Sequence, residues 1–393
     1  MSDLRRLADL VGQARAVTVL QNALRRERVA HAYLFAGPEG VGKSTAALLF
    51  AQALNCEQRG NAGSPDACGE CRSCQLIARG NHPDVRVITR EVDEQGRQRA
   101  EIVLDQLRQD PNKPPRLPRP LIQDALLRPA LGGRKVYILD PADRMRAEAA
   151  NALLKLIEEP PPQVVLVLVT SQPAALLPTA LSRCQRVGFQ LVGTAAIEQR
   201  LVALGVGGET AAAVSRLSGG RIGWAIQAAR QPEVLATRRA LLELCAEIEQ
   251  QGMAAALGAA EQVRLIAAEM AAARGSKQPE EGEETGDDEG REPEEQTLAR
   301  GRGAGDWALR RELPWCLEVM ASWYRDWLAA SHGAGLINQD FADRLPTGIS
   351  PPRLARAEAA IVAVLEAKRQ VQRNANIDLV LERLAISLLG GAQ

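Results

Sequence analysis

Eight residues near the start of the chain have the types and spacing that bind the phosphates of a nucleotide. The run 37–44 (GPEGVGKS) fits the pattern G-x-x-x-x-G-K-[ST]. An apolar segment, 32–36, precedes it and is expected to form a strand, and residues 43–54 are expected to form a helix. This strand–loop–helix context is the one in which the motif binds phosphate.

In such a loop the glycines allow backbone N–H groups to turn toward phosphate oxygens, and the helix N-terminus adds partial positive charge. Lys43 is expected to reach the terminal phosphates, and Ser44 to offer its hydroxyl to Mg²⁺. The alternative is a tight glycine turn that binds nothing, but the complete pattern in its context favours a nucleotide. The residues expected to bind ATP or ADP with Mg²⁺ are Gly37, Gly40, Gly42, Lys43, Ser44, Thr45 and Asp140.

A cluster of cysteines predicts a metal site. Cys56, Cys68, Cys71 and Cys74 have the spacing C-x11-C-x2-C-x2-C, while the other three of the seven cysteines are scattered. Four thiolates complete a tetrahedral shell and leave no open position, so we expect structural rather than catalytic Zn²⁺. The alternative is a loop of four unligated cysteines, and His82 nearby is expected to be a loop residue.

The segment 135–143 (KVYILDPAD) is an apolar strand that ends in an acidic residue. In phosphate-loop enzymes a carboxylate here holds Mg²⁺, and Asp140 fits that role. The next residue is often a glutamate that activates water, but here it is Pro141, which has no side chain that can serve as a base. Asp143 lies at the wrong offset. We therefore expect nucleotide binding to be retained and hydrolysis to be weak or absent.

The bulk properties indicate a cytoplasmic protein of two or three domains. The chain has 393 residues, 46% of them hydrophobic, and a net charge of zero. No apolar stretch approaches the ~20 residues that span a bilayer, so no membrane partner is expected. Ten acidic residues and one basic residue lie between Pro279 and Glu295, which leaves a mild basic excess elsewhere that allows a surface facing nucleic acid.

The order of patterns predicts an α/β domain followed by all-α domains. Residues 1–192 alternate strands with helices and predict a mostly parallel sheet, residues 193–231 predict a small helical lid, and residues 232–393 a helical domain. Segments 110–120 and 275–305 are expected to be insertions, the second of them disordered, and neither receives a function. The expected strands are 31–36, 85–89, 135–139, 164–170 and 186–189.

Taken together, these motifs resemble the clamp-loader branch of the AAA+ ATPases, and within it the delta-prime type of bacterial DNA polymerase III subunit. The zinc module, at about 55–80, stands where that family inserts one, and the last helical domain resembles the family's collar. The other stretches that carry the resemblance are 11–13 (VGQ), 28–34 (RVAHAYL), 150–161 (ANALLKLIEEPP), 182–184 (SRC), 322–328 (SWYRDWL), 336–340 (LINQD) and 373–382 (RNANIDLVLE).

The resemblance implies partners and a site residue that the pattern alone does not. It implies a five-membered ring with gamma or tau motor subunits and a delta subunit, which loads a sliding clamp on primer-template DNA as part of a DNA polymerase complex. Arg183, of the S-R-C triplet, would act in trans as an arginine finger at the neighbouring motor subunit's nucleotide. Thr170 and Ser171 lie where the family senses the γ-phosphate; the alternative is a hydroxyl that caps the strand end.

Departures from the motor subunits favour a subunit that donates an arginine over one that hydrolyses ATP. Motor subunits carry an acidic pair where this chain has Asp140-Pro141, and a lid arginine at the position that aligns with Gly223; Arg221 lies two residues away. Two alternatives stay open: an active gamma- or tau-like ATPase, and a zinc-bearing nucleotide-dependent switch outside replication. Glu158 and Glu159 are adjacent, so they should diverge on a helix surface rather than form a catalytic pair.

Overall fold

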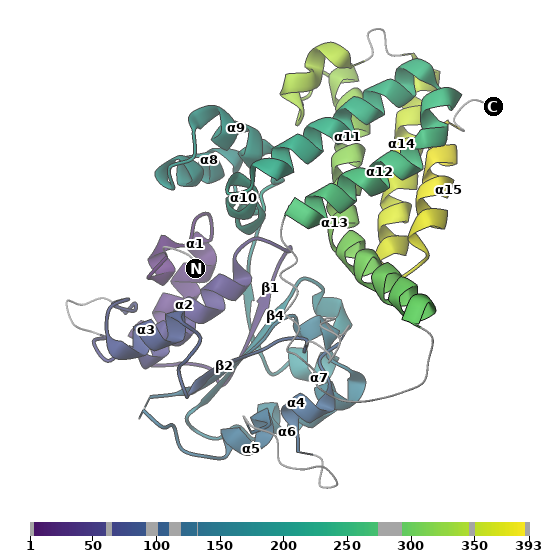
Figure 1. Ribbon diagram of the computed structural model, residues 1–393. Helices are drawn as coiled ribbons and strands as arrows, with labels where there is room; N and C mark the ends of the chain where they lie inside the picture. Colours follow the sequence, from purple (N-terminus) through teal and green to yellow (C-terminus); the bar gives the residue numbers. More distant parts are fainter. Residues whose placement is uncertain are drawn as a thin grey trace. The chain divides into compact units, whose positions relative to one another are not determined.

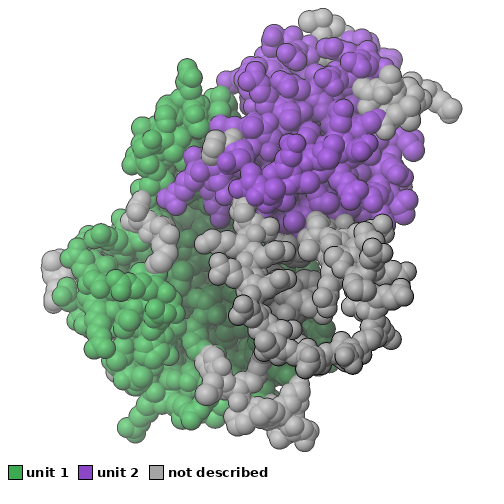
Figure 2. Space-filling model, in the orientation of Figure 1, with its two compact units in different colours: residues 1–226 green, residues 227–393 purple. Residues whose placement is uncertain are grey.

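The protein forms two compact units, residues 1–226 and residues 227–393 (Figure 2). The computed structural model describes residues 4–59, 65–91, 101–109, 119–131, 133–273, 293–345 and 350–389, although not the side chains of 232, 253–257 and 293–307. Residues 110–118 and 274–292, which hold most of the two expected insertions, lie outside the described residues. Among the helices of the described ranges, none is both long and apolar enough to cross a membrane.

The first unit is built on a five-stranded parallel sheet with the strand order β2-β3-β4-β1-β5 (Figure 1). The α/β prediction is confirmed, and each expected strand is present within one or two residues of its predicted bounds. The strands are β1 (Ala32–Ala36), β2 (Val85–Ile88), β3 (Lys135–Leu139), β4 (Val164–Thr170) and β5 (Gln185–Gly188).

Helices cover both faces of this sheet, which is why β1, β3 and β4 are buried at every position and almost entirely apolar. Alternate residues of β1 belong to opposite cores, because successive side chains of a strand point to opposite faces. Tyr33 and Phe35 pack with Phe50 in one core, and Leu34 lies in the other.

The helices of the first unit divide between the two faces of the sheet, and three more form the expected lid. One core lies under α1 (Ala14–Arg25), α2 (Lys43–Asn55) and α3 (Arg72–Ala78), with a 3-10 turn at Leu7–Asp9. The opposite core lies under α4 (Leu104–Leu107), α5 (Leu121–Ala125), α6 (Ala147–Glu158) and α7 (Pro178–Leu181). The expected lid consists of α8 (Thr194–Ala203), α9 (Gly208–Leu217) and α10 (Ile222–Ala229), separated by glycine-containing turns.

The second unit is helical, as expected. It contains α11 (Pro232–Gln251), α12 (Met253–Ala273), α13 (Pro293–Ser331), α14 (Pro351–Gln372) and α15 (Ile377–Leu389), with a 3-10 segment at Gln339–Arg344. One face of α13 forms its core, where Cys316, Met320, Trp323 and Trp327 are each at most 3% exposed. That stripe is therefore packed inside the unit and is not a platform for bases.

Charged residues anchor the segment after α13 within this unit. Arg238 donates hydrogen bonds to both carboxylate oxygens of Asp340 at 2.6 Å and to the Asn338 side chain at 2.8 Å. The buried Asp326 accepts hydrogen bonds from the backbone N–H groups of Ile337 and Asn338. These bonds to ionised groups hold a polar segment against the helices.

Helix α13 begins at Pro293, inside the segment expected to be disordered up to residue 305. Proline at the first helical position, followed by Glu294 and Glu295, is a favourable start for a helix because it suits the terminal N–H groups and the dipole. The expected disorder of the insertion 275–305 stays a prediction, since most of that segment lies outside the described residues. The three-domain division stays a prediction, since the lid up to Ile226 belongs to the same compact unit as the sheet.

Two leucine truncations test the buried position of the central strand. Leu168 in β4 is fully buried, whereas Leu126 is 72% exposed. We expect Leu168→Ala to lower the free energy of unfolding by about 3–5 kcal/mol, because a cavity is left between sheet and helices. Leu126→Ala should change it by less than about 0.5 kcal/mol. Urea denaturation of the full chain measures both, and equal losses would contradict the assigned burial.

Candidate functional site

Four groups of the candidate nucleotide site meet at one edge of the sheet. The loop 37–42 follows β1, Asp140 follows β3, Thr170 ends β4, and Phe189 follows β5. The strands are parallel, so their carboxyl ends lie on the same side, where ligands of open α/β sheets bind. The fold thus brings together residues that are more than 150 positions apart in the sequence.

The phosphate loop has the backbone geometry that its glycines predict. Gly42 has a φ of 97°, in the left-handed region that glycine adopts without strain, and α2 begins directly after it. At Gly37 the requirement is close approach instead, because a Cβ there would lie 2.3 Å from the Phe189 carbonyl oxygen. The first glycine of the motif is therefore required by packing against the end of β5.

Lys43 and Asp140 lie together at the mouth of the loop. The Lys43 ammonium donates hydrogen bonds to the carbonyls of Gly37 at 2.8 Å and Pro38 at 2.6 Å. Burial lowers the pKa of Lys43, and the carboxylates of Asp140, Glu39 and Asp143 oppose that shift. Burial raises the pKa of Asp140, against a hydrogen bond with Ser44 and the charge of Lys43. The expected magnesium-binding pair of Ser44 and Asp140 is thus in contact.

Pro141 occupies the position after Asp140, so no carboxylate stands there. Asp143 is buried nearby, and its carboxylate accepts a hydrogen bond from the Thr170 hydroxyl at 2.5 Å. The same hydroxyl accepts a hydrogen bond from the backbone N–H of Gln172 at 2.9 Å. Thr170 therefore caps the strand end, and γ-phosphate sensing by Thr170 or Ser171 stays a prediction.

Two contacts that the sequence did not indicate connect the loop to the lid. The Gly223 N–H donates to the Gly40 carbonyl at 2.7 Å, at the start of α10. The buried Gln13 amide donates to the carbonyl oxygens of Val41 at 3.2 Å and Gln190 at 2.7 Å. Gln13 belongs to the stretch that resembles the family's base-binding segment, and its side chain here joins the loop to the segment between β5 and the lid.

The S-R-C triplet forms a turn between α7 and β5 in which each side chain has a different environment. Ser182 donates to the Thr179 carbonyl at 3.0 Å, and Cys184 packs against the core under α6 and α7. Burial raises the pKa of the Cys184 thiol to about 11. The Arg183 side chain is 43% exposed and forms an ion pair with Glu158. Burial of the cysteine thus anchors a turn that presents the arginine.

The four clustered cysteines come together in space. Their Sγ atoms all lie within 4.8 Å of one another, and those of Cys68 and Cys74 are 4.0 Å apart. A tetrahedral zinc ion with Zn–S bonds of ~2.3 Å requires sulfurs about 3.8 Å apart. The sulfurs of Cys56, Cys68, Cys71 and Cys74 therefore fit one zinc ion with little adjustment.

Backbone N–H groups point at these sulfurs. The N–H of Cys68 donates to the Cys56 sulfur at 3.3 Å, and those of Glu70 and Cys71 donate to the Cys68 sulfur at 3.4 and 3.3 Å. Burial raises the pKa of Cys68, but these N–H bonds and the neighbouring thiols outweigh it and lower its pKa to about 7. N–H donors that favour thiolate are what a metal-binding turn needs. His82 lies outside the cluster, as expected.

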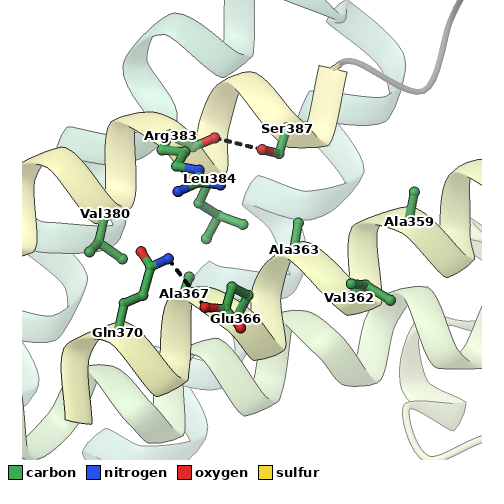
Figure 3. Close-up of a pocket in the computed structure, with 10 residues that line it drawn as sticks. All are labelled: Ala359, Val362, Ala363, Glu366, Ala367, Gln370, Val380, Arg383, Leu384 and Ser387. Atoms are coloured by element: carbon green, nitrogen blue, oxygen red, sulfur yellow. Dashed lines mark hydrogen bonds between the residues drawn. The ribbon is translucent and has the colours of Figure 1, made fainter. Parts of the chain in front are cut away.

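A separate groove of about 520 Å³ opens between α14 and α15 in the second unit (Figure 3). Alanines 359, 363 and 367 form one side, with Glu366 and Gln370 hydrogen-bonded to each other on the same helix. The Ser387 hydroxyl donates a hydrogen bond to the carbonyl of Arg383, one turn earlier on the same helix, α15. The residues that line this groove include no set of metal ligands and no activated nucleophile.

Comparisons with known proteins find similarity to subunits of DNA polymerase III. Residues 12–192 match the family model described as "DNA polymerase III, delta subunit". DNA polymerase III subunit delta' of Bacillus subtilis is 33% identical over 240 residues, which are 61% of this chain and 66% of that protein. The Pseudomonas aeruginosa subunit delta' is 43% identical over 171 residues, 44% of this chain and 46% of that protein. The matched regions thus span from just under half to just under two thirds of the length of these relatives.

More distant similarities extend beyond the delta' relatives. DNA polymerase III subunit tau of Escherichia coli is 36% identical over 194 residues, 49% of this chain and 27% of that protein. A solved gamma subunit-related protein of Thermotoga maritima is 16% identical, with a TM-score of 0.44 over 94% of this chain and 98% of that one. A TM-score below 0.5 adds nothing to the argument.

A parallel sheet with a loop of the phosphate-loop sequence after β1, an acidic residue after β3 and a helical lid defines a domain with the AAA+ fold. With the family match, residues 12–192 belong with the clamp-loader subunits of DNA polymerase III, and the chain is similar to subunits named delta'.

Differences in thiol pKa give a test of the cysteine cluster. In metal-depleted protein Cys68 should be alkylated first by iodoacetamide, at a rate that falls about tenfold per pH unit below its pKa of about 7. Cys184 should react far more slowly, because burial raises its pKa to about 11. One equivalent of Zn²⁺ should protect Cys68. Peptide mass spectrometry measures both sites, and labelling of Cys68 that ignores zinc would count against a metal site.

Proposed function

We propose that this protein is a clamp-loader subunit of the delta-prime type, acting in bacterial DNA replication. It would sit in a pentameric ring beside a gamma or tau motor subunit and a delta subunit, and would help to load the sliding clamp on primer-template DNA. The match over residues 12–192 and the names of the relatives support this role over a switch outside replication. A replication subunit of this kind would work in the cytoplasm.

The first part of the proposal is that the phosphate loop binds ATP or ADP with Mg²⁺. The loop glycines, the buried Lys43 and the contact between Ser44 and Asp140 support it. Thr45, the next residue of α2, lies in the first turn of the helix beside them. The first N–H groups of this helix have no carbonyl acceptor within the helix, so they are free to donate hydrogen bonds to phosphate oxygens.

The second part is that this subunit hydrolyses ATP weakly or not at all. The observation that carries it is an assembled phosphate loop combined with proline directly after Asp140. Pro141 offers no group that can take a proton from water, and Asp143 is held by the Thr170 hydroxyl. The binding groups are therefore retained without a positioned base.

The third part is that Arg183 acts in trans on the neighbouring motor subunit's ATP. Its exposed side chain on a turn anchored by Cys184 supports this role. An arginine finger stabilises negative charge on the transferring phosphoryl group and is worth ~10³–10⁵ in rate for GTPases. We expect the lower end of that range or less here.

The fourth part is that Cys56, Cys68, Cys71 and Cys74 hold a structural zinc ion. Their mutual distances, the all-thiol donor set and the backbone N–H bonds to sulfur support it. The bound ion would tie the end of α2 to α3 across the residues between Cys56 and Cys68. All four positions of the metal would be filled, so it would supply no chemistry to a substrate.

An active motor ATPase is the second candidate, and one observation favours it. The carboxylate of Asp143 lies close enough to Lys43 to influence its pKa, so a second acid is present in the site. In that case Asp143 would have to release Thr170 before it could act on water. Comparison of Lys43→Ala with the wild type in the assembled loader separates the candidates, because only a motor would lose its own share of turnover.

Nucleotide binding is tested with the isolated full-length chain. Lys43→Ala should raise the Kd for ATP about 10–100-fold, because a hydrogen bond to a charged group contributes about 1.5–3 kcal/mol. The control is Lys155→Ala, since Lys155 is exposed on α6. Calorimetric titration measures Kd, and circular dichroism checks the fold. An unchanged Kd would mean that the loop does not hold the phosphates.

The arginine is tested in a loader reconstituted with its motor and delta partners. Arg183→Ala should lower DNA-stimulated ATPase activity at least about tenfold while the complex still assembles. The variant removes the guanidinium that stabilises negative charge on the transferring phosphoryl group, and it leaves the subunit contacts in place. Arg186→Ala is the control, since Arg186 is also exposed and lies in the next strand. Turnover that survives Arg183→Ala unchanged would refute a role in trans.

A further inference from the structure

The side chain of Arg183 is held by two partners from its own subunit. Its Nη2 atom lies 3.2 Å from the Glu158 carboxylate, and its Nη1 donates to the Thr179 carbonyl at 3.1 Å. The Thr179 carbonyl also accepts from Ser182. Both ends of the guanidinium fork are thus fixed, although the side chain stays 43% exposed.

Glu158 stands at an unfavourable place for a carboxylate. It is the last residue of α6, and the C-terminal end of a helix carries partial negative charge that favours cations. Arg183 brings a cation to this end from a turn 25 positions later. The carboxylate and the helix end therefore attract the guanidinium together.

The energy of this contact is too small to explain it as a fold-stabilising pair. Both side chains are nearly half exposed, and ion pairs between exposed side chains contribute little to stability. Its larger effect is on conformation, because a free arginine side chain has many rotamers and loses their entropy when it is ordered. A contact that orders the side chain beforehand removes part of that cost when a phosphate arrives.

We propose that Glu158 is the positioning residue for Arg183. This inference rests on the proposed action of Arg183 in trans. The Glu158 carboxylate and the Thr179 carbonyl hold the guanidinium in one orientation on the subunit surface, and the N–H groups not engaged by them face the neighbour's phosphates. Arginine has five N–H donors, so two internal bonds leave three for the partner.

The neighbouring Glu159 provides a matched control. It follows the last residue of α6, with φ −125° and ψ 68°, and is exposed. Within the described part of the chain it forms no ion pair, whereas Glu158 does. Replacement of either residue by glutamine removes one negative charge from the same surface.

The experiment compares four variants in the reconstituted loader: Glu158→Gln, Glu159→Gln, Arg183→Ala and the double variant Arg183→Ala/Glu158→Gln. Glu158→Gln should lower the DNA-stimulated kcat about threefold to tenfold, while the KM for ATP changes less than twofold. This loss in kcat is smaller than the ~100-fold that a 1 Å misplacement of a catalytic group can cost, because the Thr179 carbonyl still holds the arginine. Glu159→Gln should match the wild type. The double variant should equal Arg183→Ala, because Glu158 acts only through the arginine.

Three outcomes would overturn the inference. Wild-type turnover in Glu158→Gln, together with a loss in Arg183→Ala, removes the positioning role and leaves the proposed function standing. A further loss on adding Glu158→Gln to Arg183→Ala shows that Glu158 acts independently of the arginine. Unchanged turnover in Arg183→Ala removes both. Gel filtration and thermal melts, expected to be unchanged in Glu158→Gln, exclude a defect of assembly or folding.

Discussion

The burial of β1 between β4 and β5 is the constraint on which the rest of the first unit depends. Because β1 is covered on both faces and paired on both edges, its last residue leads into the phosphate loop at a fixed place and direction. The register of β1 with β4 brings Ala36 beside Thr170, and its pairing with β5 brings Phe189 against Gly37. A rigid strand thereby sets the loop geometry that glycine alone would leave free.

Elsewhere in the first unit, buried residues hold polar groups in place. Cys184 fixes the turn of Arg183, and N–H groups of a tight turn aim at the Cys68 sulfur. Gln13 ties the loop to the segment that leads into the lid. In each case the packed side chain or backbone contributes order, and the exposed or liganding group contributes chemistry. This division is typical of sites whose function depends on orientation.

The nucleotide site and the arginine turn point to different uses of one fold. The phosphate loop keeps its lysine, hydroxyl and acid, while Pro141 removes the base position and Asp143 is engaged by Thr170. The arginine turn, by contrast, faces outward with its guanidinium ordered. In the function proposed above, the first site would hold nucleotide and the arginine turn would act on the nucleotide of a neighbouring subunit.

The sequence by itself determined the α/β unit, the strand bounds, the phosphate loop and the cysteine cluster, because each depends on local spacing and on apolar runs that one segment carries. The expected disorder of 275–305 was inferred from composition alone and stays a prediction. Only the tertiary structure decided that Gly37 is required by Phe189, that Gly223 contacts Gly40, and that Glu158 holds Arg183. Those contacts join residues 25 to more than 180 positions apart, and such distant pairs meet only when the packed sheet and helices bring them together.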